Sequence, residues 1–292
     1  MQPTHNMRCM RPVNKLLANI GLPKTGTTYL GSVLKKSARV SVSRVKEPSF
    51  FIKREHCAYP IIKKVMVKGN LERGHKWYIS LFDETRSLLV DQSTQYWLSQ
   101  KKVIDAASDK YEFYPYVICR NPIAQIKSYI AHLRRGYLPN LSLEEICQSD
   151  PEFKKYLISM YDFSKRSESK RGVIDGILYL DFDLLVSEAS EICALISSYT
   201  GTDIRVTSPE DPVAKGDRTV KNERGYPKSF ALNAFITSSF VKRVGAITPS
   251  FIYGTLIAFR KWLIRSNLKP GDSEWGHADF EYLQVLLSYE TK

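Results

Sequence analysis

The chain has 292 residues, 43% of them hydrophobic, which is enough to bury the core of one large α/β domain and excludes a disordered chain. Its 43 basic and 30 acidic residues give a formal charge of +13, which favours an anionic partner: a nucleotide, an acidic glycan, a nucleic acid or an anionic membrane surface. The five cysteines are scattered without a Cys-x-x-Cys pair, which indicates reduced thiols and argues against structural zinc.

The first predicted elements are a strand and a helix joined by a glycine loop. The apolar run 16–18 predicts the strand, and apolar residues at helical spacing over 29–34 predict the helix. The loop, 19–28, reads Asn-Ile-Gly-Leu-Pro-Lys-Thr-Gly-Thr-Thr. Its glycines allow a tight turn with inward N–H groups, and the helix start adds donors for an anion. The loop therefore predicts a phosphate-binding site formed by Pro23, Lys24, Thr25, Gly26, Thr27 and Thr28.

The place of the lysine distinguishes this loop from that of nucleoside triphosphate-binding proteins. In G-x-x-x-x-G-K-[ST] the lysine follows the second glycine, but here Thr27 has that place and Lys24 stands three residues earlier. Pro-Lys-Thr-Gly-Thr-Thr resembles the 5′-phosphosulfate loop of sulfotransferases, which use 3′-phosphoadenosine 5′-phosphosulfate (PAPS). The resemblance implies that Lys24 is catalytic and contacts the donor. A P-loop nucleotide kinase or phosphotransferase, and an ordinary strand-to-helix turn, are the alternatives.

A second predicted strand, 40–45, runs into the segment 46–51, Lys-Glu-Pro-Ser-Phe-Phe. A carboxylate just past a strand end, beside a lysine, is a candidate general base, and a surface Lys–Glu pair before a proline turn is the alternative. The segment resembles the Lys-Glu-Pro-x-Phe-Phe stretch of glycan sulfotransferases of the heparan type. That resemblance implies that Glu47 is the catalytic base and that Lys46 contacts the acceptor.

Residues 53–86 are rich in aromatic and basic side chains, which suits either sugar rings or nucleobases. Within them, 74–82 resembles the Lys-Gly-x-x-Trp-Tyr-x-x-x-Phe stretch of the same glycan enzymes. Arg73, His75 and Lys76 are the candidate contacts with an acidic acceptor.

A short buried strand is predicted over 88–90, and the residues after it, 91–97, resemble the Glu-Lys-Ser-Pro-x-Tyr segment of the same enzymes. Gln92 replaces the lysine of that segment. The resemblance therefore gives no second catalytic lysine at this point.

A second nucleotide motif follows the apolar run 114–119, which predicts a buried strand. Arg120 stands at its end, and Asn121 followed by proline is a good start for a helix to about residue 135. A guanidinium and a hydroxyl beside a helix start provide donors for a terminal phosphate. Arg-x-Pro with Ser128 eight residues after Arg120 resembles the 3′-phosphate motif of sulfotransferases.

The remaining chain continues the alternation of helices and strands. Residues 140–169 are predicted to be helical, and 176–185 predicts the strand that closes the sheet, followed by a helix to about residue 199. The polar stretch 209–227 predicts a loop. Residues 220–229 resemble the Asn-x-x-x-x-Pro-Arg-Ser stretch that closes over the nucleotide in bacterial sulfotransferases. The resemblance implies two further donor contacts, Asn222 and Arg224.

Together these features predict an α/β, P-loop-like three-layer fold, with a central parallel sheet flanked by helices and a helical C-terminal cap. We expect a single domain, with a core over 16–229 and the cap over 230–292. Contact of 230–265 with a membrane surface is the alternative to the cap. Apolar runs shorter than a membrane span, and no apolar leader in 1–15, favour a cytoplasmic protein, at most peripheral to the inner face of the membrane.

The resemblance implies a PAPS-dependent sulfotransferase that needs no metal and acts on a glycan or glycolipid acceptor, with a lipid or a small-molecule alcohol as the alternative acceptor. His56 and His132 are competing candidates for the base, because other branches of that family use histidine. A basic nucleic-acid-binding domain is the non-enzymatic alternative; the chain contains no recognised reader motif, so we expect no nucleic acid partner.

Overall fold

The computed structural model describes residues 14–53, 69–134, 142–205, 226–227, 268–269 and 277–288. The chain divides into two compact units. The sheet unit comprises residues 1–57, 67–120 and 164–207, and the helical unit comprises 58–66, 121–163 and 208–292. The expected single domain over 1–292 stays a prediction.

The sheet unit contains a six-stranded sheet. Its strands are β1 (Lys15–Asn19), β2 (Val40–Val42), β3 (Leu88–Asp91), β4 (Glu112–Cys119), β5 (Gly172–Ile174) and β6 (Ile177–Asp181). They lie in the order β2-β3-β1-β4-β6-β5, and every neighbouring pair from β2 to β6 is parallel. This arrangement confirms the α/β class with a central parallel sheet.

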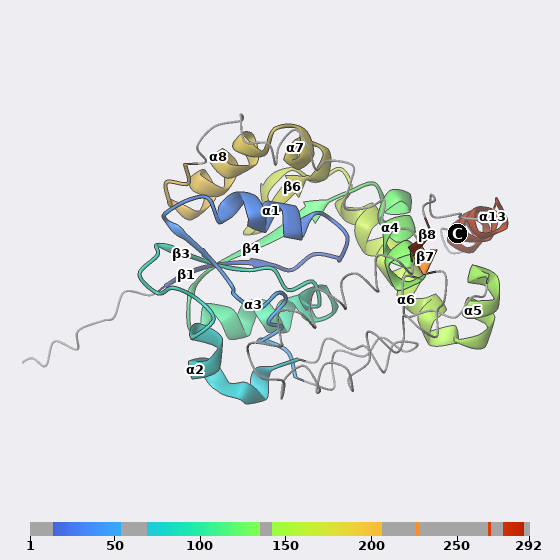
Figure 1. Cartoon of the computed structure of the whole chain (residues 1–292), viewed down its shortest axis with the longest axis horizontal. Helices are drawn as coiled ribbons and strands as arrows, with labels where there is room; N and C mark the ends of the chain where they lie inside the picture. Colours follow the sequence, from blue (N-terminus) through green and yellow to red (C-terminus); the bar gives the residue numbers. More distant parts are fainter. Residues whose placement is uncertain are drawn as a thin grey trace, which may run out of the picture. The chain divides into compact units, whose positions relative to one another are not determined.

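Helices cover both faces of this sheet (Figure 1), so residues on both sides of its central strands are buried. The helices α1 (Thr27–Leu34), α7 (Phe182–Ser187) and α8 (Ala189–Thr200) lie on one face, and α3 (Gln100–Ser108) lies on the other. Leu16 and Leu17 of β1 are both fully buried although they point to opposite faces. Leu17 packs in one core cluster with Leu30 of α1 and Ile196 of α8.

Two strands differ from the sequence-based expectation. The strand expected over 40–45 ends at Val42, because the chain turns where the Ser43 hydroxyl donates to the Val45 carbonyl at 2.8 Å. The strand expected to close the sheet, β6, is instead covered by the antiparallel strand β5. Asp175 and Gly176 form the two-residue turn between them, with φ values of 51° and 74°. Such a turn needs a left-handed backbone, which Asp-Gly provides.

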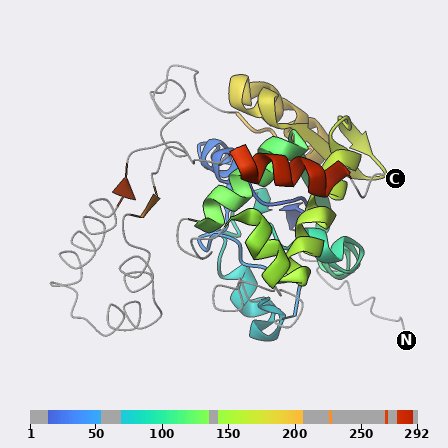
Figure 2. The ribbon, with the colours of Figure 1, turned by 90° about the vertical axis from the view of Figure 1, so that its right-hand side faces the viewer.

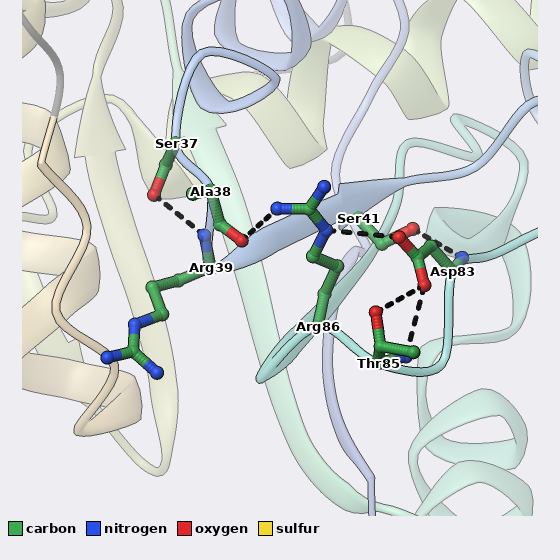
Figure 3. Close-up of polar contacts among 7 residues, drawn as sticks. All are labelled: Ser37, Ala38, Arg39, Ser41, Asp83, Thr85 and Arg86. Carbon is green, nitrogen blue, oxygen red and sulfur yellow. Dashed lines mark hydrogen bonds and ion pairs between the residues drawn. The ribbon is translucent and has the colours of Figure 1, made fainter.

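The edge strand β2 is covered by the turn that precedes β3 (Figure 3). The Asp83 amide donates to Ser41 Oγ at 2.8 Å, and Arg86 donates to the Ala38 carbonyl. Arg86 Nε also pairs with Asp83 Oδ2 at 3.1 Å, and Thr85 Oγ1 donates to Asp83 Oδ1 at 2.6 Å. Polar and charged side chains along an edge strand oppose pairing with another chain. The turn therefore protects the edge strand β2 from pairing with another chain.

The helical unit contains α4 (Pro122–Arg134), α5 (Leu143–Ser149), most of α6 (Pro151–Ser167) and α13 (His277–Ser288). Asn121 caps α4 as expected, since its Oδ1 accepts from the Ala124 amide at 3.0 Å. Figure 2 shows α13 lying across α4 and α5. The Asp279 carboxylate accepts from the Leu143 amide at 2.7 Å, and Lys127 Nζ lies 3.9 Å from the centre of the Phe280 ring.

Of the C-terminal cap expected over 230–292, the structure describes α13 and the two-residue strand β8 (Leu268–Lys269), which pairs with β7 (Tyr226–Pro227). The alternative membrane contact through 230–265 lies outside the described residues. Short segments complete the sheet unit: η3 (Leu71–Arg73), α2 (Gly74–Ile79) and η4 (Tyr96–Ser99). No helix in the described part of the chain has the length and apolarity needed to cross a bilayer.

Candidate active site

The parallel strands bring four candidate segments to one edge of the sheet. The glycine loop follows β1, Arg120 follows β4, and Asp91 ends β3. Phe182, directly after β6, begins α7. Because parallel strands end on the same edge, segments distant in sequence meet there, as in other open α/β sheets.

Two left-handed residues shape the glycine loop. Gly26 has a φ of 90° and precedes α1, and a Cβ at this position would lie 3.1 Å from the ring of Phe182. Lys24 has a φ of 66°, a conformation that costs a residue with a Cβ roughly 1–2 kcal/mol. Strain of this kind persists where the surrounding structure enforces it, and it is concentrated at functional sites. The loop is therefore built to hold Lys24 in one conformation.

The start of α1 provides backbone amides that are available to an anion at the glycine loop. The first bond within the helix runs from the Leu30 amide to the Gly26 carbonyl at 3.0 Å. The amides of residues 27–29 precede that bond and have no acceptor inside the helix. The Thr25 hydroxyl, expected to face a phosphate, donates to the Leu22 carbonyl at 3.0 Å and stabilises the loop. Thr27 is buried, whereas Thr28 is exposed.

Arg120 is fixed against the glycine loop by contacts on both sides. Its Nη1 donates to the Lys24 carbonyl at 2.7 Å, and its Cζ lies 4.2 Å from the centre of the Phe182 ring. The Ser164 hydroxyl donates to the Arg120 carbonyl at 3.1 Å. Burial lowers the pKa of Arg120. A guanidinium has five N–H donors, more than the Lys24 carbonyl takes, so Arg120 is equipped to bind an anion beside the loop.

The other expected donor contacts stay predictions. Ser128 lies on α4 in the helical unit, whereas Arg120 belongs to the sheet unit, and its convergence with Arg120 stays a prediction. Asn222 and Arg224 lie outside the described residues, as does His56. His132 lies on the exposed surface of α4.

Glu47 lies in a strained loop, and its side chain is held by a residue of the segment that follows β3. Its φ is 55°, and the Thr94 hydroxyl donates to its Oε2 at 3.1 Å. Burial raises the pKa of Glu47, while the charges of Lys46 and Lys24 lower it. The structure thus brings the two expected catalytic side chains, Lys24 and Glu47, within electrostatic reach of each other. A partly buried carboxylate with a raised pKa is suited to act as a base.

The expected acceptor contacts lie on and beside α2. Arg73, His75 and Lys76 are all exposed. The Arg73 guanidinium lies 4.1 Å from the centre of the Trp77 ring. His75 Nε2 is 2.7 Å from the Tyr111 hydroxyl, and partial burial lowers the pKa of His75. The lowered pKa favours the neutral form of His75, so the positive charge on this segment comes from Arg73 and Lys76.

Sequence reasoning missed several residues of this site. The sequence analysis assigns no role to Thr94, which holds Glu47, although 91–97 resembles a segment of the glycan enzymes, and none to Phe182, which packs on Arg120. Gln92 was recognised where the related segment has lysine, and its side-chain amide donates to the Thr27 carbonyl in the first turn of α1. The segment after β3 thus contacts the glycine loop through an amide. Within the described ranges, no three His, Cys, Asp or Glu side chains gather in a way that could hold a metal ion.

Comparisons with known proteins give likenesses of structure. No family model matches the chain, and neither does any curated protein sequence. The chain is similar to the crystal structure of a sulfotransferase from Alicyclobacillus acidocaldarius, with a TM-score of 0.47 and 16% identity over 87% of this chain and 96% of that one.

Two further solved structures are similar at lower TM-scores. The sulfotransferase domain of the Synechococcus PCC 7002 olefin synthase has a TM-score of 0.41 and 14% identity, covering 99% of this chain and 97% of that one. Mouse sulfotransferase SULT7A1, in complex with PAP, also has a TM-score of 0.41 and 14% identity, covering 96% of this chain and 85% of that one. Likenesses this distant do not establish a shared activity, so the function must be argued from the side chains themselves.

Proposed function

We propose that this chain is a sulfotransferase that moves the sulfuryl group of PAPS to a hydroxyl or amine of a glycan or glycolipid. The observation that carries the proposal is the group formed by Lys24, Arg120 and Glu47. A lysine in a strained glycine loop, an arginine bonded to that loop and a partly buried carboxylate are the groups that such a transfer needs.

The donor would be bound through its two phosphate ends. The 5′-phosphosulfate fits the loop 23–28, where helix amides, the helix dipole and the Lys24 ammonium favour an anion. The 3′-phosphate fits Arg120, with Ser128 as the expected second contact. We place Asn222 and Arg224 over the nucleotide as further donor contacts.

The transfer itself needs positioning and charge stabilisation. The acceptor oxygen or nitrogen attacks the sulfur while the bond from the sulfur to the 5′-phosphate oxygen breaks, with 3′-phosphoadenosine 5′-phosphate (PAP) as the leaving group. Glu47 takes the proton of the acceptor, and Lys24 neutralises the charge that develops on the bridging oxygen. The neighbouring cations serve both steps, since they attract the anionic donor and keep a fraction of Glu47 ionised.

The acceptor is expected to be anionic. Arg73 and Lys76 present exposed charges, and Lys46 stands exposed directly beside Glu47. Sugar chains with acidic groups match exposed cations next to an aromatic ring such as Trp77, which stacks with Arg73. We therefore favour an acidic glycan or glycolipid over a small neutral alcohol.

The nucleotide alone tests the donor site, without knowledge of the acceptor. PAP should raise the melting temperature of the protein, and adenosine 5′-phosphate should do so far less, because Arg120 has no 3′-phosphate to bind in the second ligand. A ligand at a hundred times its dissociation constant adds about 2.7 kcal/mol of stability, which differential scanning fluorimetry detects readily. Equal shifts with the two nucleotides would refute the donor assignment. A shift with magnesium–ATP but none with PAP would instead favour the P-loop kinase.

A further inference from the structure

Asp91, at the end of β3, is a fully buried carboxylate that accepts four hydrogen bonds. Its Oδ1 accepts from the Ser93 amide at 2.8 Å and from the Ser93 hydroxyl at 2.6 Å. Its Oδ2 accepts from the hydroxyls of Tyr78 and Tyr96, both at 2.8 Å. A buried charge is tolerated when donors of this number and geometry surround it.

Two of these donors also hold the loop that carries Glu47. The Ser93 hydroxyl accepts from the Ser49 amide at 2.7 Å, and the Tyr96 hydroxyl accepts from the Phe50 amide at 2.9 Å. Each hydroxyl has one proton, which it donates in its hydrogen bond to Asp91. The lone pairs of both hydroxyls are therefore turned toward the loop, and the carboxylate sets their orientation.

The loop needs such support because its backbone is strained. Glu47 and Ser49 have φ values of 55° and 50°, which residues with a Cβ rarely adopt. Each such residue costs on the order of 1–3 kcal/mol, so the conformation persists only where neighbouring groups enforce it. Asn70 adds a further contact to the loop, since its Nδ2 donates to the Pro48 carbonyl at 2.8 Å.

We propose that the segment 91–96 positions Glu47 for proton transfer: Asp91 orients Ser93 and Tyr96, these hold the strained loop, and Thr94 holds the Glu47 carboxylate itself. The inference rests on the proposed function, because it assigns positioning residues to the base of that reaction. None of these side chains touches the reacting atoms in the mechanism above.

Electrostatics around Glu47 agrees with this assignment. Burial raises the pKa of Glu47, and the Asp91 charge adds to that effect. Lys46, the hydroxyl of Thr94 and Lys24 lower the pKa. Thr94 therefore favours the ionised form of Glu47, which is the form that accepts a proton.

The first test replaces the direct donor. Thr94→Val keeps the shape of the side chain but removes the hydroxyl, so kcat should fall about tenfold, as expected for a lost hydrogen bond to a charged group. The acid limb of the pH–rate profile should move to higher pH, because the ionised form of Glu47 loses its donor. Thr94→Ser restores a hydroxyl and should recover both properties. An unchanged profile in Thr94→Val would overturn the assignment of Thr94.

A matched pair of tyrosines tests the wider network. Tyr78→Phe and Tyr96→Phe each remove one fully buried hydroxyl from Asp91 Oδ2, but only Tyr96 also accepts from the loop. Tyr96→Phe should therefore lower kcat several-fold more than Tyr78→Phe, while the melting shift produced by PAP stays similar in both. Equal losses of kcat in the two variants would overturn the positioning role.

The wild-type protein separates this inference from the proposed function. If wild type is stabilised by PAP and transfers sulfuryl groups, the variants decide the inference alone. If wild type does neither, the proposed function fails, and the inference fails as a statement about that reaction. In that case an NMR titration of the Glu47 carboxyl carbon still shows whether Thr94→Val raises the pKa of Glu47. The Glu47 signal is assigned by its absence in Glu47→Gln.

Discussion

The burial of Glu47 affects both the basicity of its carboxylate and the stability of the folded protein. Burial raises its pKa because a carboxylate loses solvation inside the protein, and the neighbouring lysines reverse only part of this effect. The same desolvation makes the carboxylate a stronger base. The residue is therefore useful to a proton-transfer reaction and costly to the folded state at the same pH.

Replacing Glu47 with glutamine should abolish most of the chemistry and leave the donor site intact. The amide keeps the shape of the side chain but accepts no proton, so turnover should fall by about a hundredfold or more, while PAP affinity changes little. The wild-type rate should also rise with pH through one ionisation that the variant lacks. His132→Gln serves as the control. A Glu47→Gln enzyme with normal turnover, together with an inactive histidine variant, would assign the base to histidine.

The same substitution should change stability in a pH-dependent way. Because the folded state raises the pKa of Glu47, the folded protein binds this proton more tightly than the unfolded chain does. The contribution of Glu47 to the free energy of unfolding is therefore fully present below its pKa in the unfolded chain, about 4.3. It is lost as the pH rises through the pKa of Glu47 in the folded protein. Glu47→Gln has no such loss, so its free energy of unfolding should exceed that of wild type at pH near 7.5 and match it near pH 4.

Urea unfolding at the two pH values measures this effect. Glu84→Gln, at an exposed carboxylate, is the matched control and should leave the difference between the two pH values as in wild type. If Glu47→Gln were less stable than wild type at the higher pH, the folded protein would be shown to stabilise the carboxylate of Glu47 instead of the neutral acid.

At the scale of elements, the strand–loop–helix unit from β1 to α1 is specified by its own sequence. Apolar residues form the strand, Gly26 takes the left-handed position before the helix, and apolar residues at helical spacing bury one side of α1. Lys24 is the exception, since its left-handed backbone is one that local sequence preferences disfavour. Local rules are broken at the residue to which the chemistry is assigned, as is common in functional sites.

The strain at Lys24 can be separated from the role of its side chain. Lys24→Gly and Lys24→Ala both remove the ammonium, so both should lose most of the turnover. Glycine adopts a positive φ without a steric penalty, so Lys24→Gly should be about 1 kcal/mol more stable than Lys24→Ala. Chemical denaturation of the two variants measures the difference. Equal stabilities would show that the loop relaxes once the lysine is gone.

Local patterns predicted most of the elements but few of the contacts between them. The strands β1, β3 and β4 and the start of α4 agree with prediction, because hydrophobic runs and an asparagine cap are written in neighbouring residues. The β5–β6 hairpin was missed although Asp175-Gly176 is a strong turn signal, because the pattern of helices and parallel strands was extended past it. The Arg120–Lys24 bond and the Thr94–Glu47 bond join segments far apart in sequence, so spacing alone does not show them.

At the scale of the whole molecule, the charge of +13 draws every polyanion toward the protein. This field explains why composition favours a nucleic-acid-binding domain as readily as an enzyme for anionic substrates. The two differ in how binding is localised. A fixed donor site binds two phosphate ends with a few oriented groups, whereas a diffuse basic surface binds many phosphates and releases many counterions.

Salt should therefore separate the two kinds of binding. Affinity for a single-stranded oligonucleotide, measured by fluorescence anisotropy, should fall by about three-hundredfold or more between about 50 and about 200 mM salt if six or more phosphates are neutralised. The melting shift produced by PAP should decline much less, because only two phosphate ends are bound and Arg120 is partly screened from solvent by the Phe182 ring and the loop. Adding PAP at low salt should leave oligonucleotide binding largely intact, since the bulk of that attraction comes from the surface. A protein that binds the oligonucleotide but is not stabilised by PAP at any salt concentration would be a nucleic-acid-binding domain, and the donor site described here would have no function.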